Sequence, residues 1–135
     1  MIHGVGTDIL SRARFGAPEP DDPFIRRAYT QAERTEAEGR SDPNRWYCTR
    51  FAGKEAVFKA LGMNPDLARL DEIEILSDVF GVPRVRLLGR MADFAARAGV
   101  THVHLSLSWE TEYAVAFAVA ERAEQGGPIK LELKY

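Results

Sequence analysis

The stretch from Tyr113 to Ala120 alternates strictly between bulky and small side chains. Its bulky members are Tyr113, Val115, Phe117 and Val119, and an alanine follows each of them. Successive side chains of a β-strand point to opposite faces, so this pattern predicts a strand with one bulky face and one alanine face. We expect the bulky face to fill a core and the alanine face to lie close to a helix or another subunit.

Other segments show the same period of two. Residues 72–76 and 84–88 have strand character, and Ser77, Asp78 and Gly81 between them predict a hairpin. In residues 102–108, His102, His104, Ser106 and Ser108 share one face, opposite Val103, Leu105 and Leu107. Residues 2–5 suit a brief strand that ends before Asp8.

Helical spacing marks three further segments. Thr30 and Glu33 have the spacing of a capping box, which predicts a helix that ends near Gly39. Residues 41–62 form a longer helical pattern, with Pro43 at its start and Gly62 as terminator. Met91, Phe94, Ala95 and Ala98 predict a short amphipathic helix, whereas the proline-rich residues 16–23 predict a loop.

This order of elements predicts the α+β class, with a small antiparallel sheet packed against one long helix. We expect one domain over residues 1–120 and a tail over 121–135, in which residues 130–135 alternate enough to form an edge strand. A chain of 135 residues has the usual size of a single domain.

Charge and composition exclude several functional classes. The formal net charge is −2, so the molecule as a whole is not a basic nucleic-acid binder. No apolar run approaches the roughly 20 residues of a membrane helix. Cys48 is the single cysteine, which rules out an intrachain disulfide and is typical of a buried apolar position. With no signal-peptide pattern at the start, we expect a cytoplasmic protein without membrane partners.

A few residues are candidates for chemistry. Asp8 follows an apolar stretch, and Glu55 and Lys59 lie one helical turn apart, where a surface ion pair is the alternative interpretation. Gly4-Val5-Gly6 lacks the third glycine of a dinucleotide fingerprint. His102 and His104 share a strand face, but no cysteine or further histidine is near them to complete a metal site.

The chain resembles the holo-acyl-carrier-protein synthase family, within the phosphopantetheinyl transferase superfamily, over residues 2–120. Five blocks carry the resemblance, in order along the chain: Val5-Gly6-Thr7-Asp8-Ile9 followed by Arg14; Phe24 to Thr30 followed by Glu33; Arg50 to Gly62; Gly81-Val82-Pro83; and Ser106-Leu107-Ser108 followed by Tyr113-Ala114. The resemblance implies a 4′-phosphopantetheinyl transferase-like fold.

The resemblance also implies an activity. Members of the family transfer 4′-phosphopantetheine from coenzyme A to a serine of an apo acyl carrier protein and release adenosine 3′,5′-bisphosphate, a step that supports fatty acid biosynthesis. Asp8 and Glu55 match the two carboxylates that hold Mg²⁺ in the family. Lys59 matches its phosphate-stabilising lysine, and either Glu55 or a water on the cation is the base for the serine proton.

Binding roles follow from the same resemblance. Arg50 and Ser106 match positions near coenzyme A, the co-substrate, and Arg14 and Arg27 match positions that face the acidic helix of the carrier protein. The alternative for both arginines is a solvated surface position. The family assembles as a homotrimer with active sites between subunits.

Two features depart from the family. Trp109 stands where the family has a histidine after Ser-Leu-Ser; an indole can pack on pantetheine or adenine but cannot accept a proton. This change motivates the alternative of a non-catalytic paralogue that binds coenzyme A or a carrier protein. Acidic residues at 19, 21 and 22 near the docking arginines point away from the ordinary fatty-acid carrier. A generic interaction domain would keep Asp8 and Glu55 apart.

Overall fold

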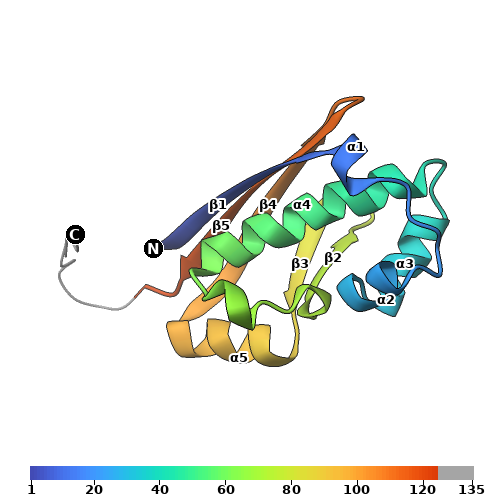
Figure 1. Ribbon diagram of the computed structural model, residues 1–135. Helices are drawn as coiled ribbons and strands as arrows, with labels where there is room; N and C mark the ends of the chain where they lie inside the picture. Colours follow the sequence, from blue (N-terminus) through green and yellow to red (C-terminus); the bar gives the residue numbers. More distant parts are fainter. Residues whose placement is uncertain (125–135) are drawn as a thin grey trace.

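The computed structural model describes residues 1–124 and contains helices on one side of two small sheets (Figure 1). Its strands are β1 (Ile2–Ser11), β2 (Ile73–Ser77), β3 (Pro83–Leu87), β4 (Val100–Trp109) and β5 (Tyr113–Arg122). Its α-helices are α1 (Arg12–Phe15), α2 (Pro23–Ala28), α3 (Gln31–Glu38), α4 (Pro43–Leu61) and α5 (Gly89–Ala98), and two 3₁₀ turns span Pro65–Leu67 and Leu70–Glu72.

The strands form two antiparallel sheets. One has the order β1-β5-β4, and the other is the β2-β3 hairpin. In the first sheet Gly6 lies opposite Ala118 and Asp8 lies opposite Ala116. The first strand of the chain therefore pairs with the last described one, and both sheets are antiparallel, as expected for the predicted α+β fold.

The long helix α4 covers one face of the three-stranded sheet (Figure 1). The four alanines of β5, at positions 114, 116, 118 and 120, are all buried in the same cluster as Ala52, Ala56 and Leu61 of α4. Small side chains on both surfaces let helix and sheet approach closely. The alanine face therefore packs against a helix of its own chain, one of the two expected neighbours.

The bulky face of β5 lies on the opposite side of the sheet. Tyr113, Val115 and Phe117 are each more than 40% exposed in the single chain. The expectation that these side chains fill the core was wrong, because the core lies under the alanines. The fold of one chain leaves this apolar face open.

Two glycines bring β1 close to α4. A Cβ atom on Gly4 would lie 2.3 Å from the backbone oxygen of Ala60, and one on Gly6 would lie 2.1 Å from that of Ala56. Real Cβ atoms do not approach oxygen so closely, so only glycine fits at either position. The Gly4-Val5-Gly6 pattern thus serves strand–helix packing and has no nucleotide role here.

We predict that Gly6→Ala destabilises the protein by about 1–3 kcal/mol or more, the usual cost of overpacking. The added methyl group must push β1 away from the backbone of α4. Urea unfolding measures the effect, and Gly39→Ala is the matched control because its Cβ meets no atom closer than 3.5 Å. Equal stability of the two variants would contradict the close packing.

The amino-terminal half of α4 carries a second, aromatic cluster that holds α2 and α3. Tyr29, Trp46 and Tyr47 are buried there together with Ile25. The Tyr29 hydroxyl donates a 2.7 Å hydrogen bond to the Tyr47 backbone oxygen. This cluster fixes the region between β1 and α4 in space.

Most predicted elements are confirmed, with two differences. β1 is longer than the predicted strand and contains Asp8, which was expected after it. Helices α1 and α2 flank the expected loop; Asp22 caps α2 by accepting a 2.8 Å hydrogen bond from the Phe24 amide. Cys48 is buried, as predicted. The predicted edge strand at 130–135 lies outside the described residues, and the boundary at residue 120 stays a prediction. Among residues 1–124, no helix has the length and apolar character needed to cross a bilayer.

Candidate active site

Asp8 and Lys59 meet where β1 crosses the last turns of α4. The Lys59 ammonium lies 3.3 Å from Asp8 Oδ1 and donates a 2.9 Å hydrogen bond to the Thr7 backbone oxygen. Gly4, Gly6 and Asp8 are every second residue of β1, so their side-chain positions share one face of the sheet. Because the two glycines face α4, Asp8 points toward this helix as well. The close strand–helix packing therefore places the carboxylate beside α4.

Glu55 lies one turn before Lys59 on the same helix. Partial burial raises the pKa of its carboxyl group, the negative charge of Asp8 raises it further, and Lys59 lowers it. The two carboxylates thus lie close enough to repel each other, with one lysine to offset them. The alternative interpretation, a surface ion pair between Glu55 and Lys59, does not form. Lys59 pairs with Asp8 instead, and no ion pair of Glu55 occurs among the described residues.

This donor set fits a small hard cation. Mg²⁺ is usually held by one or two carboxylates, with waters and substrate phosphates as its other ligands. No cluster of three or more His, Cys, Asp or Glu side chains suited to a metal occurs within residues 1–124, so an all-protein cage is absent from that part of the chain. His102 and His104, whose rings lie 4.3 Å apart, accordingly belong to no such cluster.

A cavity of about 420 Å³ opens beside the amino-terminal half of α4. Its polar and aromatic lining includes Arg40, Arg45, Trp46, Arg50, Ser77 and Trp109. Three arginines and two indoles suit a ligand that combines phosphate groups with a flat aromatic ring. The size lies within the ordinary range for small-molecule sites.

Two residues predicted to contact the co-substrate meet in this cavity. The Arg50 side chain is 9% exposed, and its Nε is a buried donor without a partner among the described residues. The Trp109 ring lies under the Arg45 guanidinium, 5.4 Å from ring centroid to Cζ. Ser106, the third predicted residue, is exposed on the outer sheet face opposite Phe117 and does not line the cavity.

Arg40, Arg45 and Trp46 were missed in the sequence. A signal was present: Trp46 and Arg50 lie four residues apart, as do Arg45 and Thr49, so each pair shares a helical face. Of the residues on this helix, the resemblance implies a coenzyme A contact for Arg50 only.

The two predicted docking arginines lie on neighbouring short helices. Arg14 is on α1 and Arg27 on α2, and both are exposed. The Phe15 and Phe24 rings, 5.9 Å apart, pack the two helices together. Neither arginine forms an ion pair with another part of residues 1–124, whereas Arg12 pairs with Asp42 at 3.0 Å. Their charges are therefore available to a partner.

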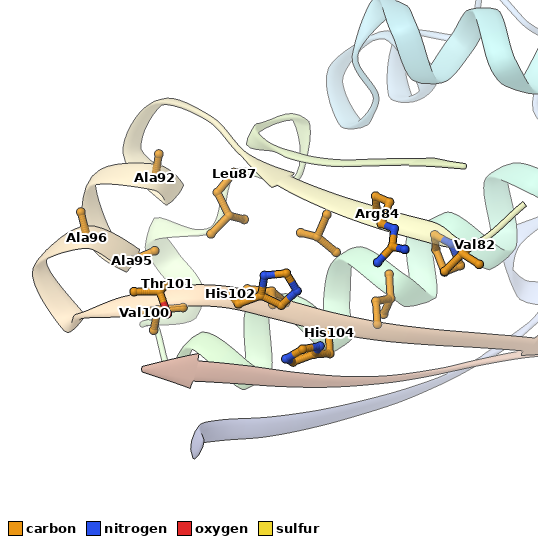
Figure 2. Close-up of a pocket in the computed structure, with 14 residues that line it drawn as sticks. Val82, Arg84, Leu87, Ala92, Ala95, Ala96, Val100, Thr101, His102 and His104 are labelled. Carbon is orange, nitrogen blue, oxygen red and sulfur yellow. The ribbon is translucent and has the colours of Figure 1, made fainter. Parts of the chain in front are cut away.

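A further cavity of about 390 Å³ lies between β3, α5 and the first half of β4 (Figure 2). Figure 2 shows apolar side chains such as Leu87 and Ala95 around it, with Arg84, His102 and His104 at its rim. None of the candidate catalytic residues lines it. It is a separate feature from the arginine-lined cavity.

Comparison with known proteins identifies the family. The model of the 4′-phosphopantetheinyl transferase superfamily matches residues 4–118. A holo-[acyl-carrier-protein] synthase of Desulforudis audaxviator is 43% identical over 122 residues, which cover 89% of this chain and 93% of that protein. The chain belongs to the holo-acyl-carrier-protein synthase family.

Solved structures of family members share the fold. A holo-ACP-synthase from Plasmodium yoelii superposes with a TM-score of 0.80 at 30% identity, covering 92% of this chain and 98% of that one. The Chronobacterium ammoniagenes ACPS–CoA complex gives a TM-score of 0.76 at 28% identity, covering 90% and 98%. The predicted family and the α+β fold with antiparallel sheets are confirmed.

Proposed function

We propose that this protein transfers 4′-phosphopantetheine from coenzyme A to a serine of an apo acyl carrier protein, with Mg²⁺ as cofactor. The observation that carries the proposal is the meeting of Asp8, Glu55 and Lys59 at one point in a member of this family. The serine oxygen forms a bond to the β-phosphorus of coenzyme A. The bond from that phosphorus to the bridging oxygen breaks, and adenosine 3′,5′-bisphosphate leaves with the electron pair.

The residues divide the work of this reaction. Asp8 and Glu55 would hold Mg²⁺, which supplies charge neutralisation for the pyrophosphate when bound. Lys59 is half exposed and offers its ammonium to a phosphoryl oxygen, where charge builds up in the transition state. Either Glu55 or a water on the cation would accept the serine proton.

The arginine-lined cavity is the proposed site for the nucleotide end of coenzyme A. Arg50 brings an unpartnered buried donor, and Trp109 offers a flat ring on which an adenine can stack. Neither role needs a side chain that takes a proton. Trp109 is therefore compatible with binding of the co-substrate despite the loss of the family histidine.

We expect Glu55→Gln to stabilise the metal-free protein by about 0.5–2 kcal/mol, as removal of a strained functional group commonly does. The raised pKa means that the ionised form of Glu55 is less favourable in the folded protein than in the unfolded chain. The protonated Glu55 carboxyl group contributes to the stability of the folded protein at low pH. This contribution is lost as the pH rises through the raised pKa. The gain from glutamine should therefore shrink toward the pKa of an ordinary glutamate, about 4.3.

Thermal unfolding at several pH values measures this gain. Mg²⁺ should raise the melting temperature of the wild type and leave that of Glu55→Gln unchanged. Lower stability of the variant at neutral pH, or an equal Mg²⁺ effect in both proteins, would remove Glu55 from the metal site.

Arg14 and Arg27 are the proposed contacts for an acidic carrier protein. Both are exposed and lie on helices joined by the Phe15–Phe24 contact. Exposed Glu19 and Asp21 in the intervening loop would repel part of an acidic surface. This arrangement favours a carrier whose acidic patch is narrow enough to meet the arginines alone.

We propose that the open sheet face pairs with other copies of the chain in a homotrimer. Val5 and Ile9 of β1 are 56% and 67% exposed. Phe117 of the neighbouring strand β5, which lies opposite Thr7 and so between these two residues, is 45% exposed. Lone soluble chains rarely expose an apolar face of this kind.

Phe117→Glu should therefore convert the assembly into single chains, because it places a charge in the buried interface. Light scattering coupled to size exclusion reads the mass directly. Val79→Glu, a change in a residue 93% exposed on the hairpin turn, is the control and should leave the mass unaltered. A wild type that is already a single chain would contradict the trimer.

A further inference from the structure

The carboxylate of Glu36, on α3, lies behind the arginine-lined cavity and gathers donors from two other elements. Its Oε1 accepts a 2.9 Å hydrogen bond from the Ser77 amide of β2. Its Oε2 accepts bonds from the Trp46 indole N–H at 2.9 Å and from the Ser77 hydroxyl at 3.1 Å. Glu36 is not among the residues that line the cavity. It therefore makes no direct contact with a ligand bound there, and it can act through its charge or through the neighbours that it holds.

The same carboxylate fixes Arg50. Glu36 Oε2 lies 3.5 Å from Arg50 Nη2, which also donates a 2.7 Å hydrogen bond to the Ser77 hydroxyl. The Arg50 guanidinium lies 4.8 Å from the centroid of the Trp46 ring. Arg50 thus contacts Glu36 directly, and its other two contacts, Ser77 and Trp46, both donate hydrogen bonds to Glu36. Arg50 Nε is left without a partner among the described residues.

The negative charge of Glu36 also holds together two arginines that line the cavity. Arg40 lies 3.9 Å from Glu36 Oε2, so two guanidinium groups share one carboxylate. Without it, Arg40 and Arg50 would repel each other and at least one would swing toward solvent. A long side chain that loses its fixed position must be ordered again when a ligand binds, which costs affinity.

We infer that Glu36 is a positioning residue for coenzyme A, holding the Arg50 guanidinium in place at the cavity wall. The inference rests on the proposed function of the cavity. It concerns a residue outside the five family blocks that carry the resemblance, and it assigns Glu36 no contact with substrate or with the reacting atoms.

The sign of the effect separates positioning from simple charge. A negative charge near an anion site weakens anion binding, so neutralising Glu36 should tighten coenzyme A binding if charge alone acts. Positioning predicts the opposite. We expect Glu36→Gln to raise the dissociation constant of coenzyme A about tenfold, the lower end of what loss of an outer-shell partner costs. KM for coenzyme A should rise in proportion, and kcat should change less than about twofold.

Calorimetric titration of the full chain with coenzyme A tests this. Glu36→Asp is a second variant that keeps the charge but shortens the reach, so it should weaken binding as Glu36→Gln does. Glu38→Gln is the matched control, because it removes the same charge from the same helix. Within residues 1–124 the Glu38 side chain accepts a hydrogen bond only from the Tyr47 hydroxyl, at 3.3 Å. Its affinity for coenzyme A should equal that of the wild type.

A double-mutant cycle with Arg50→Lys decides whether Glu36 acts through Arg50. If it does, adding Glu36→Gln to Arg50→Lys should cause little further loss. Two results would overturn the inference: full additivity of the two changes, or unchanged or tighter binding of coenzyme A by Glu36→Gln. If the wild type still binds coenzyme A, the proposed function of the cavity is upheld in either case. A wild type that does not bind coenzyme A would overturn the proposed function and the inference together.

Discussion

Lys54→Met is expected to destabilise the protein by about 3–5 kcal/mol, the cost of removing one partner of a buried ion pair. Lys54 and Glu33 are both fully buried, with 2.7 Å between Nζ and Oε1. The ammonium also donates to the backbone oxygens of Leu70 and Ile73. Methionine fills the same volume but leaves these acceptors, and a buried carboxylate, without their donor.

The loss should be larger than for an ordinary core change because Glu33 joins three elements. Its two oxygens accept hydrogen bonds from the amides of Thr30 and Ile75, at 2.9 Å each, so α3, α4 and β2 meet at this one carboxylate. Burial raises the pKa of Glu33 and lowers that of Lys54. Burial disfavours both charges, and each partner offsets part of that cost for the other.

Urea unfolding measures the effect, and Lys59→Met is the matched control. Lys59 lies on the same helix, but its side chain is 50% exposed. An exposed ion pair contributes at most about 1 kcal/mol to stability. A loss of stability in Lys54→Met no larger than in Lys59→Met would show that the buried pair does not hold the fold together.

Asp8→Asn is expected to lower transfer at least about 100-fold, because metal charge stabilisation is worth several kcal/mol and each 1.36 kcal/mol is tenfold in rate. Asparagine preserves the shape but removes one of the two proposed anionic ligands of the cation. It also removes the partner of Lys59, which lies 3.3 Å away. The fold should be retained, since Asp8 contributes no contact to the buried core clusters.

The rate of coenzyme A consumption at saturating Mg²⁺ measures this loss. Asp71→Asn is the control, because Asp71 pairs with Arg69 at 3.2 Å on another part of the surface. It should keep the wild-type rate. More than about a tenth of wild-type activity in Asp8→Asn would contradict a metal-ligand role, since such a loss is under 1.4 kcal/mol.

Local signals predicted most of the fold. The capping box at Thr30 and Glu33 forms with both of its hydrogen bonds. The long helix begins at Pro43 after the Asp42 cap, and ends at Gly62 in the left-handed conformation. What periodicity could not decide was which face of β5 is buried, because that depends on the helix packed against it. The alanines fit the glycine- and alanine-lined contact between the sheet and α4.

The candidate site was predicted from the resemblance more than from the residues alone. Glu55 and Lys59 have the spacing of a common surface ion pair, and only the crossing of β1 over α4 turns Lys59 toward Asp8. The sequence does not show that Trp46 and Ser77 line one cavity, because Trp46 lies on α4 and Ser77 on β2. Their association depends on Glu36, whose hydrogen-bond partners Trp46, Arg50 and Ser77 lie at least ten residues away in sequence.

The most direct test is the mass of an apo acyl carrier protein after incubation with this protein, coenzyme A and Mg²⁺. The account predicts a gain of one phosphopantetheine on the carrier, absent with EDTA and lost in Asp8→Asn. No gain on any of several carriers, while coenzyme A still binds to the protein, would contradict it. The protein would then be a transferase-like module that holds coenzyme A without turnover.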